Sequence, residues 1–120
     1  MDVIKTRNYY KTINNDSLCS CDYCKNYRKE IQKTYPALSD FLSDIGIDIE
    51  KPFETMPLEP DKGIIEYIAV QYIVMGNATD FKNVDVYGVH ICIADSHPST
   101  DIDVEHYVIE ISPIRLKWTV

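Results

Sequence analysis

Residues 114–120, Ile114-Arg115-Leu116-Lys117-Trp118-Thr119-Val120, alternate apolar and polar side chains without a break. Successive side chains of a β-strand point to opposite faces of the sheet, so this alternation predicts a strand with one buried face and one solvated face. Trp118 carries the largest apolar area on the buried face. We therefore expect this strand to be an integral part of a sheet.

Three upstream segments also have the composition of strands. They are enriched in Ile, Val and Tyr, which suit a pleated, half-buried surface, and they are residues 64–75, 84–93 and 105–111. The connections between them are too short to hold a helical crossover, which parallel neighbours would need. The pattern therefore favours antiparallel pairing.

Before these strands, the hydrophobic period changes to that of α-helices. One helix is predicted from residue 22, where aromatic and aliphatic side chains recur every fourth position. A second is predicted to be capped by Thr34, to carry Pro36 in its first turn and to end at Gly46. This second helix should bury one stripe of side chains, namely Leu38, Phe41, Leu42 and Ile45.

The first segment, residues 3–13, alternates weakly and contains Thr, Tyr and Ile, so we predict a strand there. The predicted fold class is therefore α+β, with an N-terminal strand and a helical pair packed with a mostly antiparallel β-sheet. A chain of 120 residues fits a single domain. Its helical part should span about residues 22–46 and its sheet part about residues 53–120.

The chain is acidic, with 12 Lys and Arg residues against 19 Asp and Glu residues and a formal net charge of -7. Nucleic-acid binding depends on cationic side chains at phosphates, and a negative membrane surface repels an acidic protein. We therefore expect no nucleic acid and no membrane as partners, which leaves another protein or self-association.

The first residues lack the apolar core of a signal peptide, and the longest apolar stretch, residues 64–75, is too short to span a bilayer. These features predict a cytoplasmic location. Because the cytoplasm is reducing, the four cysteines are expected as thiols or metal ligands rather than as disulfides.

Three segments have distinctive spacing, namely residues 19–27 (CSCDYCKNY), residues 46–48 (GID) and residues 116–118 (LKW). Together they resemble a group of small uncharacterised proteins from Firmicutes-type bacteria, which have a C-x-C-x-x-C-x-N-aromatic segment, a G-I-D segment and a closing Leu-x-Trp strand. Lys117 stands where the pattern of that group has proline. The resemblance covers most of the chain. It implies a bacterial origin and brings no activity with it.

The cluster Cys19, Cys21 and Cys24 has the strongest chemical character in the sequence. The C-x-x-C spacing of the last two lets both thiolates reach one tetrahedral Zn²⁺, and Cys19 is close enough to be a third ligand. A closed zinc site needs a fourth ligand. The candidates are Cys92 and His106, together with His90, His97 and water.

Two other interpretations of these thiols stay open. In a redox interpretation, Cys24 lies in the first turn of a helix, whose dipole lowers the pKa of the thiol. In a structural interpretation, the thiols are reduced and buried and behave as small hydrophobic residues. We favour the structural interpretation, because the sequence places only three candidate ligands close together and a closed metal site needs four.

No catalytic residue and no cofactor other than Zn²⁺ is predicted, since the histidines lie in no known catalytic motif and the four glycines are too dispersed for a phosphate loop. Our first hypothesis is a non-enzymatic accessory or protein-interaction domain, which should show an apolar patch flanked by tyrosines. The alternative is a metal- or thiol-dependent enzyme that uses Cys19, Cys21 and Cys24. That enzyme would need an open concave site beside Cys21 and Cys24, with a histidine or carboxylate in reach.

Overall fold

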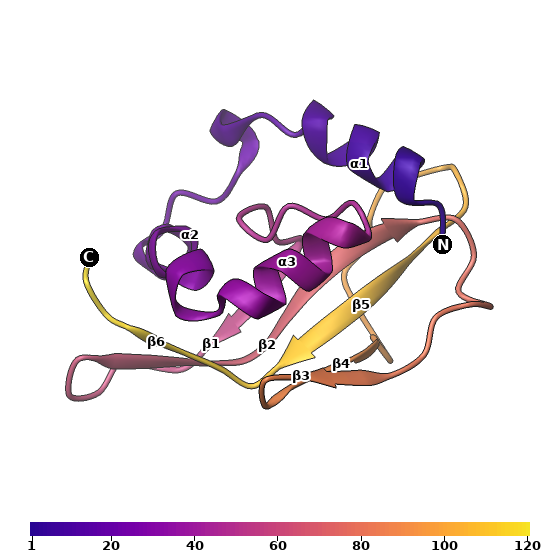
Figure 1. The fold of residues 1–120 in the computed structure, drawn as a ribbon. Helices are drawn as coiled ribbons and strands as arrows, with labels where there is room; N and C mark the ends of the chain where they lie inside the picture. Colours follow the sequence, from indigo (N-terminus) through magenta and orange to yellow (C-terminus); the bar gives the residue numbers. More distant parts are fainter.

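A computed structural model describes residues 1–120 as three α-helices, one short 3-10 helix and a six-stranded antiparallel sheet (Figure 1). The helical elements are α1 (Val3–Thr12), η1 (Asn15–Ser17), α2 (Asp22–Thr34) and α3 (Pro36–Asp44). The strands are β1 (Glu54–Pro57), β2 (Ile64–Met75), β3 (Val84–Val86), β4 (Val89–Ile93), β5 (His106–Ser112) and β6 (Ile114–Lys117). The predicted α+β class with an antiparallel sheet is confirmed.

The long strand β2 organises the sheet, whose strand order is β1-β2-β5-β4-β3. On the side away from β1, β2 pairs first with β6 and then with β5, both antiparallel. Tyr67 lies opposite Ile114 and Val70 lies opposite Ile111, so the register is the same on both sides of Pro113. The strands β5 and β6 therefore act as one long, interrupted partner of β2.

The helices α2 and α3 cover one face of this sheet (Figure 1). From the helices, Tyr27, Ile31, Leu38 and Leu42 are fully or almost fully buried. From the strands, the core includes Ile65, Tyr67, Val70, Tyr72, Val74, Val89, Ile91, Ile109, Ile111, Ile114 and Leu116. The predicted packing of the segment 114–118 is confirmed, since Ile114 and Leu116 are buried and Trp118 packs against the core.

The helix α3 ends as the sequence predicts. Gly46 has a φ of 92°, its N–H donates to the Ser43 carbonyl, and the Ile47 N–H donates to the Leu42 carbonyl at 2.9 Å. These two bonds form a Schellman motif, which satisfies the last carbonyls of the helix. The predicted cap is wrong by one residue, because Thr34 still belongs to α2 and Tyr35 is the N-cap of α3.

The predicted N-terminal strand is wrong, because residues 3–12 form the helix α1. The side chain of Asp2 caps this helix by accepting a hydrogen bond from the Lys5 N–H at 2.9 Å. Thr6 and Tyr10, four residues apart, lie on one helix face and are both buried. The weak alternation of the segment concealed this helical spacing.

The helix α1 closes the edge of β2 beyond the end of β1. The Ile73 N–H donates to the Tyr10 hydroxyl at 3.0 Å, and this hydroxyl donates to the Ile73 carbonyl at 2.8 Å. One turn earlier in α1, the Met75 N–H donates to Thr6 Oγ1 at 3.0 Å. Side-chain hydroxyls thus take the place of a further strand at an edge whose backbone groups would otherwise lack partners.

The predicted strand over residues 84–93 is corrected to a hairpin of β3 and β4. Its turn consists of Tyr87 and Gly88, with φ values of 49° and 81°. Positive φ at both central residues is typical of a two-residue hairpin turn, and glycine adopts it without steric strain. As a result, Tyr87 is 86% exposed at the tip of the hairpin and does not pack in the core.

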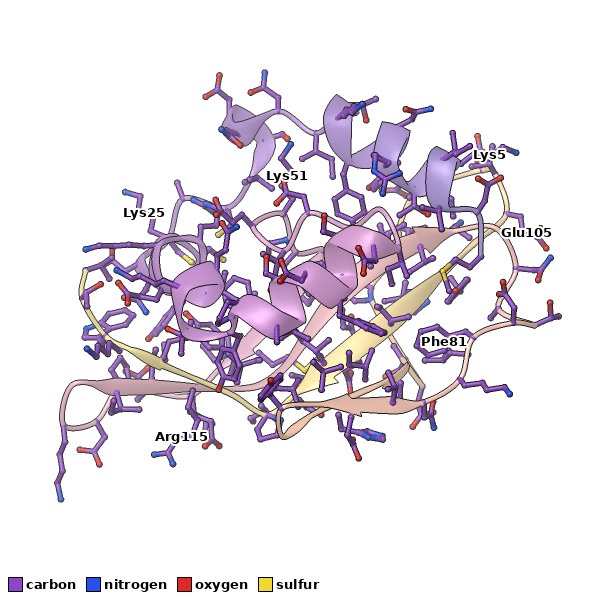
Figure 2. The ribbon with its side chains drawn as sticks, viewed as in Figure 1. Lys5, Lys25, Lys51, Phe81, Glu105 and Arg115 are labelled. Carbon is purple, nitrogen blue, oxygen red and sulfur yellow. The ribbon has the colours of Figure 1, made fainter.

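The other face of the sheet is covered only in part. Ile73, Met75 and Val108 form a small second cluster, against which Phe53, Ala94 and Ile102 pack. Gln71 on this face is also buried, and its side chain donates to the Ser96 carbonyl at 2.9 Å, whereas the part of the face at β6 is open. Arg115 projects from it, away from the helices (Figure 2). None of the helices has the length and apolar character needed to cross a bilayer.

Candidate functional site

The three clustered cysteines lie at the start of α2, on a well-anchored element. Cys21 is the N-cap of the helix and Cys24 is its third helical residue. Between them, Tyr23 packs on Trp118 with ring centroids 5.8 Å apart, and its carbonyl accepts a hydrogen bond from the Tyr67 hydroxyl. These contacts fix the first turn of α2 against the sheet and hold the thiols in place.

The structure brings together all three thiols that the sequence singled out. The sulfur atoms of Cys19, Cys21 and Cys24 lie within 4.8 Å of one another. Cys19 and Cys21 are exposed, whereas Cys24 is half-buried with its sulfur 3.8 Å from the Thr55 hydroxyl of β1. Lys25, the next residue of α2, lies at the same end of the helix (Figure 2).

The favoured structural interpretation predicted buried thiols, and for Cys19 and Cys21 it is wrong. The reason is their position, because the N-cap of a helix and the residues before it lie at the surface, outside the packed stripe. Exposed thiols contribute little to a hydrophobic core. Packing therefore does not explain why three of them lie close together.

The thiols differ in their electrostatic environment. The pKa of Cys19 is lowered, mainly by a hydrogen bond from the Cys21 backbone N–H and then by the neighbouring thiols. Burial raises the pKa of Cys24 to about 12, since desolvation disfavours its thiolate. The expectation that Cys24 is the activated thiol is therefore wrong, and Cys19 takes that place.

Arg28, one helical turn after Cys24, holds the cluster together. Its Nη1 donates to the Cys19 carbonyl at 2.9 Å and so ties the loop before α2 to the helix. Its spacing of four residues from Cys24 puts both side chains on the same side of α2, a signal in the sequence that could have revealed this role. Glu54 and Thr55 come from β1, and nothing in the sequence pointed to them.

These residues surround a small open pocket between α2 and β1. The pocket has a volume of about 180 Å³ and is lined in part by Cys19, Cys24, Arg28, Glu54 and Thr55. Arg28 and Glu54 are the charged residues that line it. The enzyme hypothesis requires a concave site beside Cys21 and Cys24. The pocket adjoins Cys24 and Cys19, but Cys21 does not line it, so that expectation is met only in part.

The proposed fourth ligand Cys92 lies too far away to join the cluster. Across the sheet, Cys92 pairs with Glu110, Glu110 with Gln71 and Gln71 with Glu54. Because neighbouring residues of a strand face opposite ways, Cys92 points away from the face on which Thr55 meets Cys24. Three strand spacings, roughly 14 Å, also separate β4 from β1.

The histidines are also separate from the cluster. His106 lies at the far end of β5 opposite Met75, where its ring nitrogens contact Thr100 Oγ1 and the Val104 carbonyl. His90 contacts Asp85 through Nδ1 at 2.8 Å. His97 contacts the Pro98 carbonyl at 2.7 Å. None of the three joins the thiols within the 4.8 Å that groups the sulfurs.

The three thiols suit a soft metal ion. A tetrahedral Zn²⁺ with Zn–S bonds of about 2.3 Å holds its sulfur ligands roughly 3.8 Å apart. Sulfur atoms within 4.8 Å of one another therefore need a contraction of only about 1 Å, which side-chain rotation can provide. Thiolates favour Zn²⁺ over Ca²⁺ and Mg²⁺, which take oxygen ligands.

No protein-family model matches the chain, and comparisons with curated proteins and with solved structures gave no significant match. The function must therefore be argued from the site alone.

Proposed function

We propose that this protein binds a thiophilic metal ion, Zn²⁺ by preference, through Cys19, Cys21 and Cys24. The observation that carries the proposal is the convergence of three thiols, two of them exposed, within 4.8 Å at the start of α2. Thiols that serve only as packing are buried, and Cys19 and Cys21 are not. Arg28 supports the same site by fixing the loop that carries Cys19.

The test uses protein purified without a metal-affinity tag. Mass spectrometry should find about one zinc ion per chain, the number that one three-thiolate site holds. The Cys21→Ser variant should weaken zinc binding by more than the roughly 10–100-fold typical of a residue that only supports a ligand. A Cys92→Ser variant is the matched control, because Cys92 lies on the other face of the sheet, and it should bind zinc as the parent does. Equal zinc affinity of the two variants would refute the proposal.

A thiol-dependent redox enzyme is the second candidate function. It is favoured by the exposure of Cys19 and Cys21 beside Cys24 and by the open pocket that adjoins them. Alkylation rates with and without a chelator separate the two functions. Alkylation that a chelator accelerates supports metal binding, whereas fast alkylation of protein that is zinc-free as purified, at a rate that a chelator does not change, favours redox chemistry.

The broader hypothesis of a non-enzymatic accessory or protein-interaction domain remains a proposal and is compatible with a bound metal ion. Its expected surface was an apolar patch flanked by tyrosines. The exposed apolar side chains of the open sheet face are Leu58, Ile64 and Ile68, whereas the most exposed tyrosine, Tyr87, lies in the β3–β4 turn. We also propose a cytoplasmic location and membership of the Firmicutes-type group that the sequence resembles.

A further inference from the structure

We propose that the metal ion at this cluster is held by three protein thiolates only and keeps its fourth coordination position for a thiolate from outside the chain. The inference rests on the proposed metal binding and specifies its chemistry. Structural zinc sites use four protein ligands, whereas sites that react or exchange use three and leave one position open.

The first argument is the ligand count around the sulfurs. The group of metal-binding side chains within 4.8 Å contains Cys19, Cys21 and Cys24, with no histidine, aspartate or glutamate. Cys92 and His106, the distant candidates, belong to the far face and far end of the sheet. Bringing either residue to the cluster would require the β-sheet to come apart.

The second argument is access. Cys19 and Cys21 are exposed, and the pocket of about 180 Å³ opens beside Cys19 and Cys24. Such a volume holds a small molecule but not a folded segment of a protein. An incoming ligand can therefore reach the ion without any change in the fold.

The third argument concerns the chemical class of the ligand. An ion that selects three thiolates is soft, and a fourth thiolate is the ligand that best matches it. The pocket is lined by one basic residue, Arg28, and one acidic residue, Glu54, so the charges of its lining balance and leave the choice of ligand to the metal ion. On binding, the S–H proton of the thiol passes to solvent, a solvent molecule leaves the ion, and the oxidation state of the metal does not change.

The test uses the Co²⁺ form of the full chain, because the absorption of Co²⁺ reports its sulfur ligands. Titrating 2-mercaptoethanol to saturation should raise the sulfur-to-cobalt absorption by roughly one third, the ratio of four thiolates to three. The mass of the protein should not change on adding the thiol, and each chain should retain its ion after gel filtration. The variants Cys92→Ser, His97→Ala and His106→Ala should all respond as the parent does.

Several results would overturn the inference. An unchanged spectrum, or loss of the ion on adding the thiol, would show that the fourth position is not available. A four-thiolate spectrum before any thiol is added, together with a doubled mass, would assign that position to a second copy of the chain. Failure of Co²⁺ to bind at all would instead refute the proposed function, so the two failures are distinguishable.

Discussion

At the scale of single residues, the tyrosines close sheet edges as well as filling the core. The Tyr10 hydroxyl binds both the N–H and the carbonyl of Ile73. The Tyr35 hydroxyl does the same for Arg115 on the outer edge of β6. Each hydroxyl is both donor and acceptor, so one tyrosine provides hydrogen-bond partners for the N–H and the carbonyl of one residue at the edge of a strand. This use explains part of the high tyrosine content without any binding surface.

We predict that Tyr10→Phe destabilises the fold by about 1–3 kcal/mol, because it leaves the buried backbone groups of Ile73 without a partner. Urea denaturation measures the change. Tyr87→Phe is the matched control, since the Tyr87 side chain is exposed, and its effect should be within about 0.5 kcal/mol. Equal stability of the two variants would show that water replaces the Tyr10 hydroxyl at this edge.

At the scale of elements, the position of α1 depends on Gly46. A Cβ atom at Gly46 would lie 2.7 Å from the Val3 carbonyl oxygen and 2.8 Å from the Arg7 nitrogen. Both are backbone atoms of α1, so they cannot move without the helix. The glycine that ends α3 therefore also lets α1 approach closely enough to reach the edge of β2.

We predict that Gly46→Ala is more destabilising than Gly63→Ala by at least about 1 kcal/mol. Both glycines have positive φ values, 92° and 76°, so both alanines incur a backbone strain of about 1 kcal/mol. Only at Gly46 does the new methyl group meet other atoms, because the space around Gly63 is empty within 4 Å. Thermal or urea unfolding of both variants measures the difference. Equal losses of stability in the two variants would mean that α1 moves away and accommodates the new methyl group at no cost.

The sequence correctly predicted those elements whose hydrophobic residues recur regularly because one face of the element packs in the main core. The stripe of α3 and the alternation over residues 114–118 both match the buried faces observed. It failed for α1 because that helix buries hydroxyl-bearing side chains, Thr6 and Tyr10, against a strand edge instead of an apolar stripe. When the buried side chains of a helix are polar groups that hydrogen-bond to the backbone of a strand, the sequence of that helix shows no regular spacing of hydrophobic residues.

At the scale of the whole molecule, α2 connects the thiol cluster to the end of the sheet. Asn26 Nδ2 donates to the Lys117 carbonyl at 2.8 Å, and its Oδ1 accepts from the Thr119 N–H at 2.8 Å. The segments 19–27 and 116–118 are thus in direct contact. Asn26 therefore seats α2 on the last strand of the sheet.

The candidate site could be predicted only in part. The cysteine spacing indicated three ligands because they are close in the sequence, and helix geometry brings such residues together. The pocket also needs Glu54 and Thr55 of β1, whose approach depends on how α2 packs on the sheet. The distant fourth ligands were wrong candidates, because only the strand register shows that Cys92 faces the other way.

Because all three proposed ligands lie within residues 19–24, we predict that zinc stabilises one corner of the fold more than the whole. Zinc at 100 times its Kd adds about 2.7 kcal/mol to the free energy of unfolding when the unfolded chain does not bind it. Here the unfolded chain keeps its C-x-C-x-x-C segment and binds zinc too, so the gain in urea denaturation should fall well below that figure. Hydrogen exchange should nevertheless slow on zinc addition at residues 19–25, with no change in the distant β3–β4 hairpin. A gain of the full 2.7 kcal/mol would contradict the prediction, because it would mean that the unfolded C-x-C-x-x-C segment does not bind zinc.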